Sequence, residues 1–302
     1  MESKVKYDVI IIGGSYAGLS AAMTLGRSLR KVLVIDSGKP CNRQTPHSHN
    51  FLTHDGSTPA AITAVAKEQV ARYKTVSFIT DSATAAAQSG DGFVISTATG
   101  DSFEGRKLLF TTGVADLMPA IDGFAECWGI SVIHCPYCHG FEVHGKPTGI
   151  LANGDTGFDF AKLISNWTDK LTIFTNGASS LNQEQQEKIS QHNMQVVEKE
   201  IQSIDHLNGN LTGIVFKDAT IFELEALYAR IPFQQHCSVP QALGCELNEM
   251  GLLVVDDFQR TTIKGIYAAG DNATPLRTVS KAVAAGTMAG AAINRELIEE
   301  DF

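Results

Sequence analysis

The sequence lacks any run of about 18 apolar residues, which is the length that a membrane-spanning helix needs. Its opening residues, 1–4, also lack the long apolar stretch of a secretory signal. Because neither a membrane span nor a signal is visible, we predict a cytoplasmic protein without a membrane partner.

Basic side chains are also scarce. Lys and Arg number 24 against 33 Asp and Glu, so the formal net charge is −9. A surface of this sign repels the phosphates of nucleic acids and of anionic lipids. We therefore expect no nucleic-acid partner.

Cysteines are few, and most are isolated. Six in 302 residues are too few for a secreted disulfide scaffold, and only Cys135 and Cys138 are closely paired. Apolar material is plentiful instead, because hydrophobic residues make up 43% and charged residues 19% of the chain. At about 150 residues per domain, the length predicts two domains, each with a core of its own.

Two stretches follow the pattern strand, small-residue turn, helix, strand. The first has a strand at 7–12, a turn at 13–18, a helix at 19–29 and a strand at 32–35 that runs into Asp36. The second has a strand at 148–152, a turn at 153–157, a helix at 158–167 and a strand at 171–175. This repeat predicts an α/β fold with two nucleotide-binding, Rossmann-like βαβ domains.

The rest of the chain gives weaker signals. A helix is expected at 62–73, followed over 76–110 by short β segments that glycines such as Gly105 interrupt. Towards the C-terminus we expect strands at 251–255 and 265–269 and a small-residue helix at 280–298.

The turn GGSYAG at residues 13–18 leads directly from a strand into a helix. Glycine allows a tight turn and the close approach of a pyrophosphate, whose charge is stabilised at a helix N-terminus. Asp36, at the end of the next strand, can accept hydrogen bonds from ribose hydroxyls. A plain strand-to-helix turn is the alternative, and Ser15 replaces the middle glycine of the usual fingerprint. Because strand, helix and terminal acid are all in place, we predict a dinucleotide site.

The segment HCPYCH at 134–139 places two cysteines three residues apart at the start of a helical turn. Such a pair can close a small disulfide ring, and neighbouring imidazoles favour one thiolate. Half of a zinc site and a pair of inert thiols are the alternatives. Zinc normally needs four ligands, and the chain has no second C-x-x-C pair. We predict a redox-active disulfide and no metal.

The segment GIYAAGD at 265–271 is a strand that runs into Gly270-Asp271, with a small-residue helix from Ser280. An aspartate at a strand end can bind a ribose or ribityl hydroxyl, although another simple strand-turn would look the same. Three histidines, His47, His49 and His54, lie in a polar loop and are expected to face solvent or the cofactor.

Together these motifs resemble the low-molecular-weight thioredoxin reductases and their relatives, the flavoprotein pyridine nucleotide–disulfide oxidoreductases. The resemblance covers nearly the whole chain and keeps its order, including TTG at 111–113. It implies that the second βαβ domain is inserted into the first. The implied limits are 1–116 and 242–302 for an FAD-binding domain and 117–241 for a nucleotide and redox-disulfide domain, usually in a homodimer.

The resemblance also implies roles for individual residues. Cys135, Cys138 and His139 would be catalytic, with FAD as the cofactor. The FAD-contact candidates are Gly13, Ser15, Ala17, Gly18, Asp36, Arg43, Asn50, Thr112, Gly113, Gly270, Asp271 and Ser280.

Two departures from the reductase pattern bear on function. The second cysteine is followed by His139 instead of an acid, which is similar to the small-molecule dithiol oxidases of the same superfamily. The second βαβ turn, ANGDTG at 152–157, carries Asp155 where a pyrophosphate would lie, and residues 176–179 contain no arginine for a 2′-phosphate. The use of NAD(P)H is therefore left open.

From these observations we predict a thioredoxin reductase-like enzyme. It would move two electrons between FAD and a dithiol or disulfide through Cys135–Cys138. The partner would be a thioredoxin-like protein or a small-molecule dithiol or disulfide. The alternatives are a small-molecule dithiol oxidase that uses oxygen as acceptor, and a non-enzymatic flavin-binding redox sensor.

Overall fold

The protein is described by a computed structural model over residues 6–302, so the opening residues on which the absence of a signal was argued lie outside the described part. The chain forms two compact units. Unit 1 contains the chain up to Arg43, Phe51–Ala115 and Phe233–Phe302, and unit 2 contains Gln44–Asn50 and Asp116–Pro232. The predicted α/β fold, with one βαβ domain inserted into another, is confirmed.

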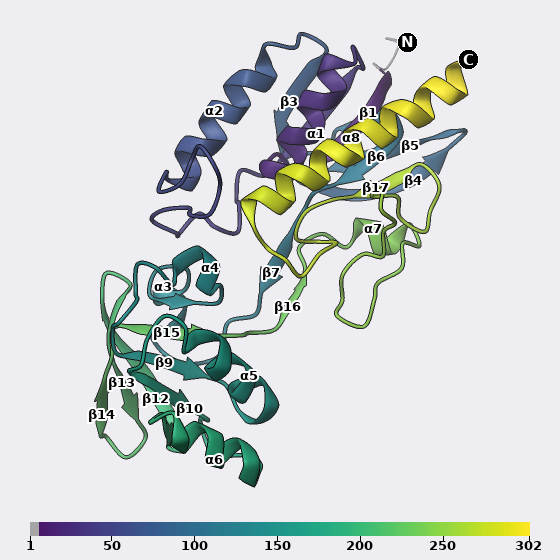
Figure 1. The fold of residues 1–302 in the computed structure, drawn as a ribbon. Helices are drawn as coiled ribbons and strands as arrows, with labels where there is room; N and C mark the ends of the chain where they lie inside the picture. The colour runs from purple at the N-terminus through teal and green to yellow at the C-terminus, as the bar shows by residue number, and fades with distance from the viewer. Residues whose placement is uncertain (1–5) are drawn as a thin grey trace. The chain divides into compact units, whose positions relative to one another are not determined.

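Unit 1 is built on a sheet with the order β3-β2-β1-β6-β5-β4 (Figure 1). Strand β17 also pairs with β6, on the edge opposite β1. The strands are β1 (Lys6–Ile12), β2 (Val32–Asp36), β3 (Val76–Thr80), β4 (Ala83–Ser89), β5 (Gly92–Thr97), β6 (Ser102–Phe110) and β17 (Ile266–Ala268). β4 and β5 run antiparallel to their neighbours, and the other pairs are parallel. Strands buried on both faces explain the near-continuous apolar sequence of β1 and β2.

The helices of unit 1 are α1 (Tyr16–Arg27), α2 (Pro59–Ala71), α7 (Val239–Ala242) and α8 (Val279–Asp301). Helix α8 lies beside α1 (Figure 1). Small residues allow this approach, because a Cβ on Gly286 would lie 2.1 Å from the Ala17 carbonyl oxygen. The small-residue composition of the C-terminal helix therefore serves helix packing.

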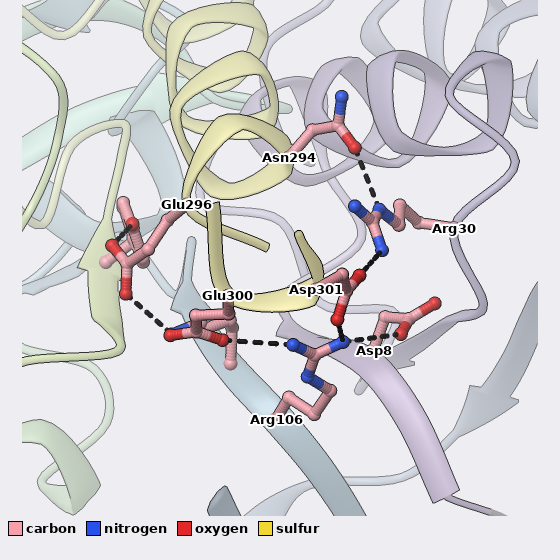
Figure 2. A network of polar contacts seen from close by, with 9 residues as sticks. Asp8, Arg30, Arg106, Asn294, Glu296, Glu300 and Asp301 are labelled. Carbon is pink, nitrogen blue, oxygen red and sulfur yellow. Dashed lines mark hydrogen bonds and ion pairs between the residues drawn. The ribbon is translucent and has the colours of Figure 1, made fainter. Parts of the chain in front are cut away.

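A polar network fixes the C-terminal end of α8 to the sheet (Figure 2). Arg106 lies 2.7 Å from Asp301 and 3.1 Å from Glu300. The ammonium group of Lys107, only 4% exposed, lies 2.6 Å from Glu296 and 2.5 Å from Glu300. These ion pairs thus hold the C-terminal part of α8 against β6. The same strand ends at Phe110, two residues before Thr112.

Unit 2 has a parallel sheet with the order β11-β10-β9-β15-β8 and a small antiparallel sheet, β12-β13-β14. The strands are β8 (Val132–Ile133), β9 (Thr148–Leu151), β10 (Leu171–Phe174), β11 (Gln195–Val197), β12 (Ile201–Leu207), β13 (Asn210–Phe216), β14 (Ile221–Glu223) and β15 (Ala226–Ala229). The helices are α3 (Phe124–Cys127), α4 (Pro136–His139), α5 (Gly154–Ile164) and α6 (Gln183–Gln191). The short strands β7 (Val114–Asp116) and β16 (Phe233–Gln235) pair where the chain passes between the units.

Several predicted elements differ from the structure. Residues 251–255 are not a strand, because the Asn248 side chain accepts hydrogen bonds from the backbone N–H groups of Met250 and Leu252 and holds a turn there. Helix α5 begins at Gly154, four positions before the predicted start at 158. Gly105 lies inside β6 and does not interrupt it; a Cβ there would lie 2.8 Å from the Ile10 side chain.

The boundary at 241 also differs from the observed division. Residues 233–241 belong to unit 1, where Cys237 and Val239 pack into its core. Within residues 6–302, none of the helices combines the length and the apolar character that a membrane span requires.

Candidate functional site

The glycine turn of unit 1 lies between β1 and α1 and is closely packed. A Cβ on Gly18 would lie 2.0 Å from the Gly13 carbonyl oxygen, and one on Gly14 would lie 2.8 Å from the Cβ of Asp36. Side chains at these positions would therefore open the turn. The structure thus brings Asp36, at the end of β2, against the turn, as the pattern predicted.

A threonine that the sequence reasoning did not single out fixes this turn. The Thr111 hydroxyl, just beyond β6, donates to the carbonyl oxygen of Gly13 at 2.7 Å. Ser15, at the N-cap of α1, makes no capping hydrogen bond with its side chain. Its hydroxyl therefore does not satisfy the first N–H groups of the helix.

The predicted Gly-Asp motif follows β17. Gly270 has a φ of +93°, and a Cβ there would lie 3.2 Å from the Ala17 side chain, so the motif packs against the first turn of α1. Asp271 lies 3.5 Å from the Arg277 guanidinium and 3.9 Å from the Cys41 sulfur. The contact with Arg277 was not predicted, because no motif links this arginine to Asp271.

Two buried oxygen atoms lie close in sequence to these motifs. Thr112 Oγ1 and Asn272 Oδ1 have no hydrogen-bond partner within residues 6–302. Asn272 is fully buried, and its amide donates to the Phe110 carbonyl oxygen at 2.9 Å. Thr75, Tyr228 and Gln235 also have buried oxygens without partners among the described residues. Thr112 and Asn272 differ from these in following the two predicted FAD motifs directly, where a polar ligand could satisfy them.

The remaining candidates are more scattered. Gly113 adopts a φ of +63° after β6, and Ser280 lies in the first turn of α8, with its hydroxyl 3.2 Å from that of Thr278. Arg43 is exposed and donates to the Pro40 carbonyl oxygen at 3.2 Å. Asn50, with a φ of +58°, belongs to unit 2, whereas the other FAD-contact candidates belong to unit 1.

Cys135 and Cys138 form a disulfide. Cys135 is the N-cap of α4, and the helical turn brings the two Cα atoms to 5.3 Å, within the range that a disulfide spans. Both residues are partly accessible. No group of three or more His, Cys, Asp or Glu side chains within residues 6–302 is arranged to hold a metal ion.

His139 closes the helix that carries the disulfide. Burial lowers the pKa of its imidazole, the negative charge of Glu142 acts to raise that pKa, and His49 acts to lower it. His49 Nε2 lies 3.4 Å from a Glu142 carboxylate oxygen. The imidazole next to Cys138 is therefore predominantly neutral near pH 7 and able to accept a proton.

Aromatic side chains surround the disulfide helix. Tyr137, 63% exposed, meets the edge of Trp167 with ring centroids 5.5 Å apart. A Cβ on Gly140 would lie 2.7 Å from the Trp167 indole nitrogen, so the indole packs directly under the end of α4. Phe141 is also exposed and stacks on His144. Trp167 thus packs against the helix, and the rings of Tyr137 and Phe141 are exposed.

The second βαβ turn, in unit 2, is closed by its own side chains. Asn153 Oδ1 accepts hydrogen bonds from the backbone N–H groups of Gly154 and Ser180, each at 2.8 Å. Its amide donates to the Ala178 carbonyl oxygen at 2.9 Å. Asp155, in the first turn of α5, accepts from the Gln185 side chain at 2.7 Å.

Comparisons with known proteins agree with this architecture. The model of the pyridine nucleotide-disulphide oxidoreductase family matches residues 7–286. The chain belongs to this family. It is similar to a thioredoxin reductase of Claviceps purpurea, with 32% identity over 97% of this chain and 95% of the relative. A thioredoxin reductase of Leptosphaeria maculans is 29% identical over 98% of this chain and 96% of the relative.

A solved structure gives the same result for the fold. The oxidoreductase from Agrobacterium tumefaciens is 36% identical, covers 98% of this chain and 99% of its own, and has a TM-score of 0.91. The predicted enzyme class is thereby confirmed: the protein is a thioredoxin reductase-like oxidoreductase and a flavoprotein.

The residues of unit 1 fit the FAD that this family binds. The glycine turn leaves no room for side chains, Asp36 lies against it, and Thr112 and Asn272 present buried oxygens without partners among the described residues. Such a set of compact backbone, carboxylate and unsatisfied polar atoms suits a dinucleotide.

The turn of unit 2 does not fit a second dinucleotide as it stands. The N–H group of Gly154, which would face a pyrophosphate, is already bonded to Asn153, and Asp155 adds a negative charge. The Ser179 N–H group donates to Glu198 at 3.0 Å, so the loop after β10 carries an acid and, over residues 176–179, no arginine that could pair with a 2′-phosphate. This turn provides no visible site for the NAD(P)H that the family uses.

Proposed function

We propose that this enzyme transfers two electrons between FAD and a dithiol or disulfide substrate through the Cys135–Cys138 disulfide. The observation that carries the proposal is this disulfide on α4, partly accessible and followed directly by a half-buried imidazole of lowered pKa. Bound FAD supplies the electron chemistry, and the protein supplies position and proton transfer.

The side chains would divide the work. A substrate thiolate attacks the Cys135 sulfur, which forms a mixed disulfide and releases Cys138 as a thiolate. A second substrate thiol then displaces Cys135, so the substrate leaves as a disulfide and the enzyme holds a dithiol. His139 accepts a proton from an incoming thiol, which raises its thiolate fraction. The reductive direction is the reverse of these steps.

Single cysteine variants test this proposal. Cys135→Ser and Cys138→Ser should each abolish turnover with dithiothreitol while the purified protein keeps its flavin absorbance. Cys245→Ser is the matched control, because its thiol in unit 1 donates to Thr261 at 3.5 Å and a hydroxyl can replace it. Near-normal turnover by either Cys135→Ser or Cys138→Ser would rule out the disulfide as the redox group.

The closed turn in unit 2 favours the oxidase direction as the second candidate. Because Asn153 already bonds the N–H groups of this turn in the described residues, the proposal has electrons enter from the dithiol and leave to another acceptor. The balanced reaction is one dithiol plus one O₂ giving one disulfide plus one H₂O₂. Aerobic turnover with dithiothreitol should then form H₂O₂ in a one-to-one ratio with disulfide. A dithiol reaction that forms no H₂O₂ in air would contradict this direction.

The substrate class follows from the surface of α4. Tyr137, within α4, and Phe141, three residues beyond Cys138, have exposed aromatic rings, and they suit an apolar small-molecule dithiol or a hydrophobic patch on a thioredoxin-like protein. Comparing a small aromatic dithiol with reduced thioredoxin as electron donor would distinguish the two. In this proposal unit 1 binds FAD and unit 2 carries the redox disulfide. The homodimer and the cytoplasmic location stay predictions.

A further inference from the structure

Gln235, the last residue of β16, has a partly buried side chain whose amide is fixed in one orientation. Its Nε2 group donates to the Gly251 carbonyl oxygen at 2.8 Å and to the Asn272 carbonyl oxygen at 3.0 Å. Backbone carbonyl oxygens only accept hydrogen bonds, so the amide nitrogen, and not the amide oxygen, must face them. The Oε1 atom therefore lies on the side of the amide that faces away from these two carbonyl groups.

This glutamine is joined to both of the later FAD motifs that the sequence predicts. Its amide bonds to Asn272, the residue that directly follows the Gly-Asp motif. Strand β16 pairs with β7, which begins directly after the TTG motif, and the His236 N–H group donates to the Gly113 carbonyl oxygen at 3.4 Å. All of these residues belong to unit 1.

Three buried oxygens without partners belong to this group of residues. Gln235 Oε1, Asn272 Oδ1 and Thr112 Oγ1 make no hydrogen bond within residues 6–302. The Asn272 amide is fixed in the same way as that of Gln235, because its Nδ2 group donates to the Phe110 carbonyl oxygen at 2.9 Å. Buried polar atoms are nearly always paired, so these oxygens require hydrogen-bond donors from outside the described chain.

The chemistry of the missing donor follows from the two amides. An amide oxygen only accepts, so it does not suit a phosphate, whose oxygens also accept and whose charge has no cation here to balance it. FAD carries suitable donors away from its phosphates, namely the N3–H group of the isoalloxazine ring and the hydroxyls of the ribityl chain and the ribose. A donor-bearing part of the cofactor therefore fits beside Gln235.

We propose that Gln235 is a cofactor-binding residue whose side-chain oxygen accepts a hydrogen bond from an N–H or O–H group of bound FAD. Gln235 lies outside the glycine turn, the TTG motif and the Gly-Asp motif, so no sequence pattern pointed to it. The inference concerns the cofactor and does not depend on the proposed role of Cys135–Cys138.

Two substitutions at this position isolate the acceptor. Gln235→Met and Gln235→Glu both remove the amide nitrogen, but only Gln235→Glu keeps an oxygen that can accept. In fluorescence titrations of the apoprotein, Gln235→Met should bind FAD about tenfold more weakly than the wild type, and Gln235→Glu should bind it more tightly than Gln235→Met. If Gln235→Glu binds FAD no more tightly than Gln235→Met, the amide acts only through Gly251 and Asn272, and the inference is wrong.

The matched control is Gln234→Met, a change of the same type at the exposed neighbour in β16. It should bind FAD with the affinity of the wild type. Thermal unfolding with and without a fixed excess of FAD covers the case in which Gln235→Met folds poorly, because FAD shifts the folding equilibrium by an amount set by its affinity. The increase in midpoint that FAD produces should be smaller in Gln235→Met than in Gln235→Glu, and equal increases would overturn the inference.

The two donor sources within FAD are distinguished with 3-methyl-FAD, which lacks the N3–H group. If that group is the donor, methylation should weaken binding to the wild type about tenfold and binding to Gln235→Met much less. If a hydroxyl is the donor, Gln235→Met should lower the affinity for both flavins by the same factor. Wild-type affinity of Gln235→Met for both flavins would rule out the proposed contact.

Discussion

Two buried side-chain oxygens near the FAD motifs of unit 1 lack the hydrogen-bond partners that buried polar atoms usually have. Thr112 Oγ1 follows β6 and Asn272 Oδ1 follows the Gly-Asp motif, and neither finds a partner within residues 6–302. Leaving such a group unsatisfied costs about 1–3 kcal/mol. A cofactor that bonds to both would recover that energy, so we expect loss of FAD to lower the stability of unit 1.

Among the FAD-contact candidates, Asp271 is the side chain whose replacement we expect to weaken FAD binding most directly. Asp271→Asn removes a largely buried charged acceptor beside Arg277. A lost hydrogen bond to a charged group costs about 1.5–3 kcal/mol, so FAD should bind at least about tenfold more weakly. Equilibrium dialysis of the released flavin measures this change. Asp257→Asn, a change at an exposed aspartate of the same unit, is the control. Equal affinity of both variants for FAD would contradict the assignment.

At the scale of elements, α8 is fixed at its C-terminal end by charge. Lys107 is the centre of that anchor, because it is almost fully buried between Glu296 and Glu300. The Tyr267 hydroxyl also donates to Glu296, which joins β17 to the same group. Removing the Lys107 ammonium group would leave the carboxylates of Glu296 and Glu300 close together and partly shielded from water, without a counter-charge between them.

Lys107→Met should therefore destabilise unit 1 strongly. Breaking a buried ion pair costs about 3–5 kcal/mol, and the partial exposure of Glu300 reduces the expected loss to about 2–4 kcal/mol. Arg295→Met on the same helix is the control, because its pair with Glu299 is exposed and should contribute less than about 0.5 kcal/mol. Urea unfolding followed by circular dichroism compares the two. Similar midpoints for both variants would show that the anchor is unimportant.

Much of the βαβ framework could be predicted from the sequence, because its signals are local. Strand β1, the glycine turn and Asp36 follow one another directly, and the structure places Asp36 against Gly14. The antiparallel strands β12–β14 were not predicted, because pairing between short strands depends on partners and not on local pattern. The strand predicted at residues 251–255 is wrong, because an apolar run can also pack as an irregular loop, here held by the Asn248 side chain.

The candidate site was predictable to a similar extent. The pair Cys135–Cys138 and the neighbouring His139 are adjacent in sequence, so their motif is visible without a structure. The contact between His49 and Glu142 is not visible in the sequence, because it depends on where the loop Gln44–Asn50 lies in the folded unit 2. The same holds for Arg277 beside Asp271, since nothing in the sequence links a loop arginine to a strand-end acid. The individual site assignments stay predictions.

At the scale of the whole molecule, the two βαβ units share one architecture and differ at the turn. In unit 1 the turn is compact, and the Ser15 side chain makes no capping bond. In unit 2 Asn153 caps the corresponding helix and binds the loop at Ser180. One chain thus contains one turn suited to a dinucleotide and one that its own side chains already fill.

This difference predicts how the enzyme responds to electron donors. NADPH and NADH should both reduce the flavin slowly under anaerobic conditions, because Asn153 and Asp155 oppose the pyrophosphate that both donors carry. NADPH should have no strong advantage over NADH, because its 2′-phosphate meets Glu198 and no arginine at residues 176–179. A dithiol should reduce it rapidly. Asn153→Gly removes the cap and should improve reduction by NADH more than by NADPH, since no arginine is added. Stopped-flow absorbance of the flavin measures all three donors, and rapid, saturable reduction of the wild type at micromolar NADPH would overturn the prediction and favour a reductase.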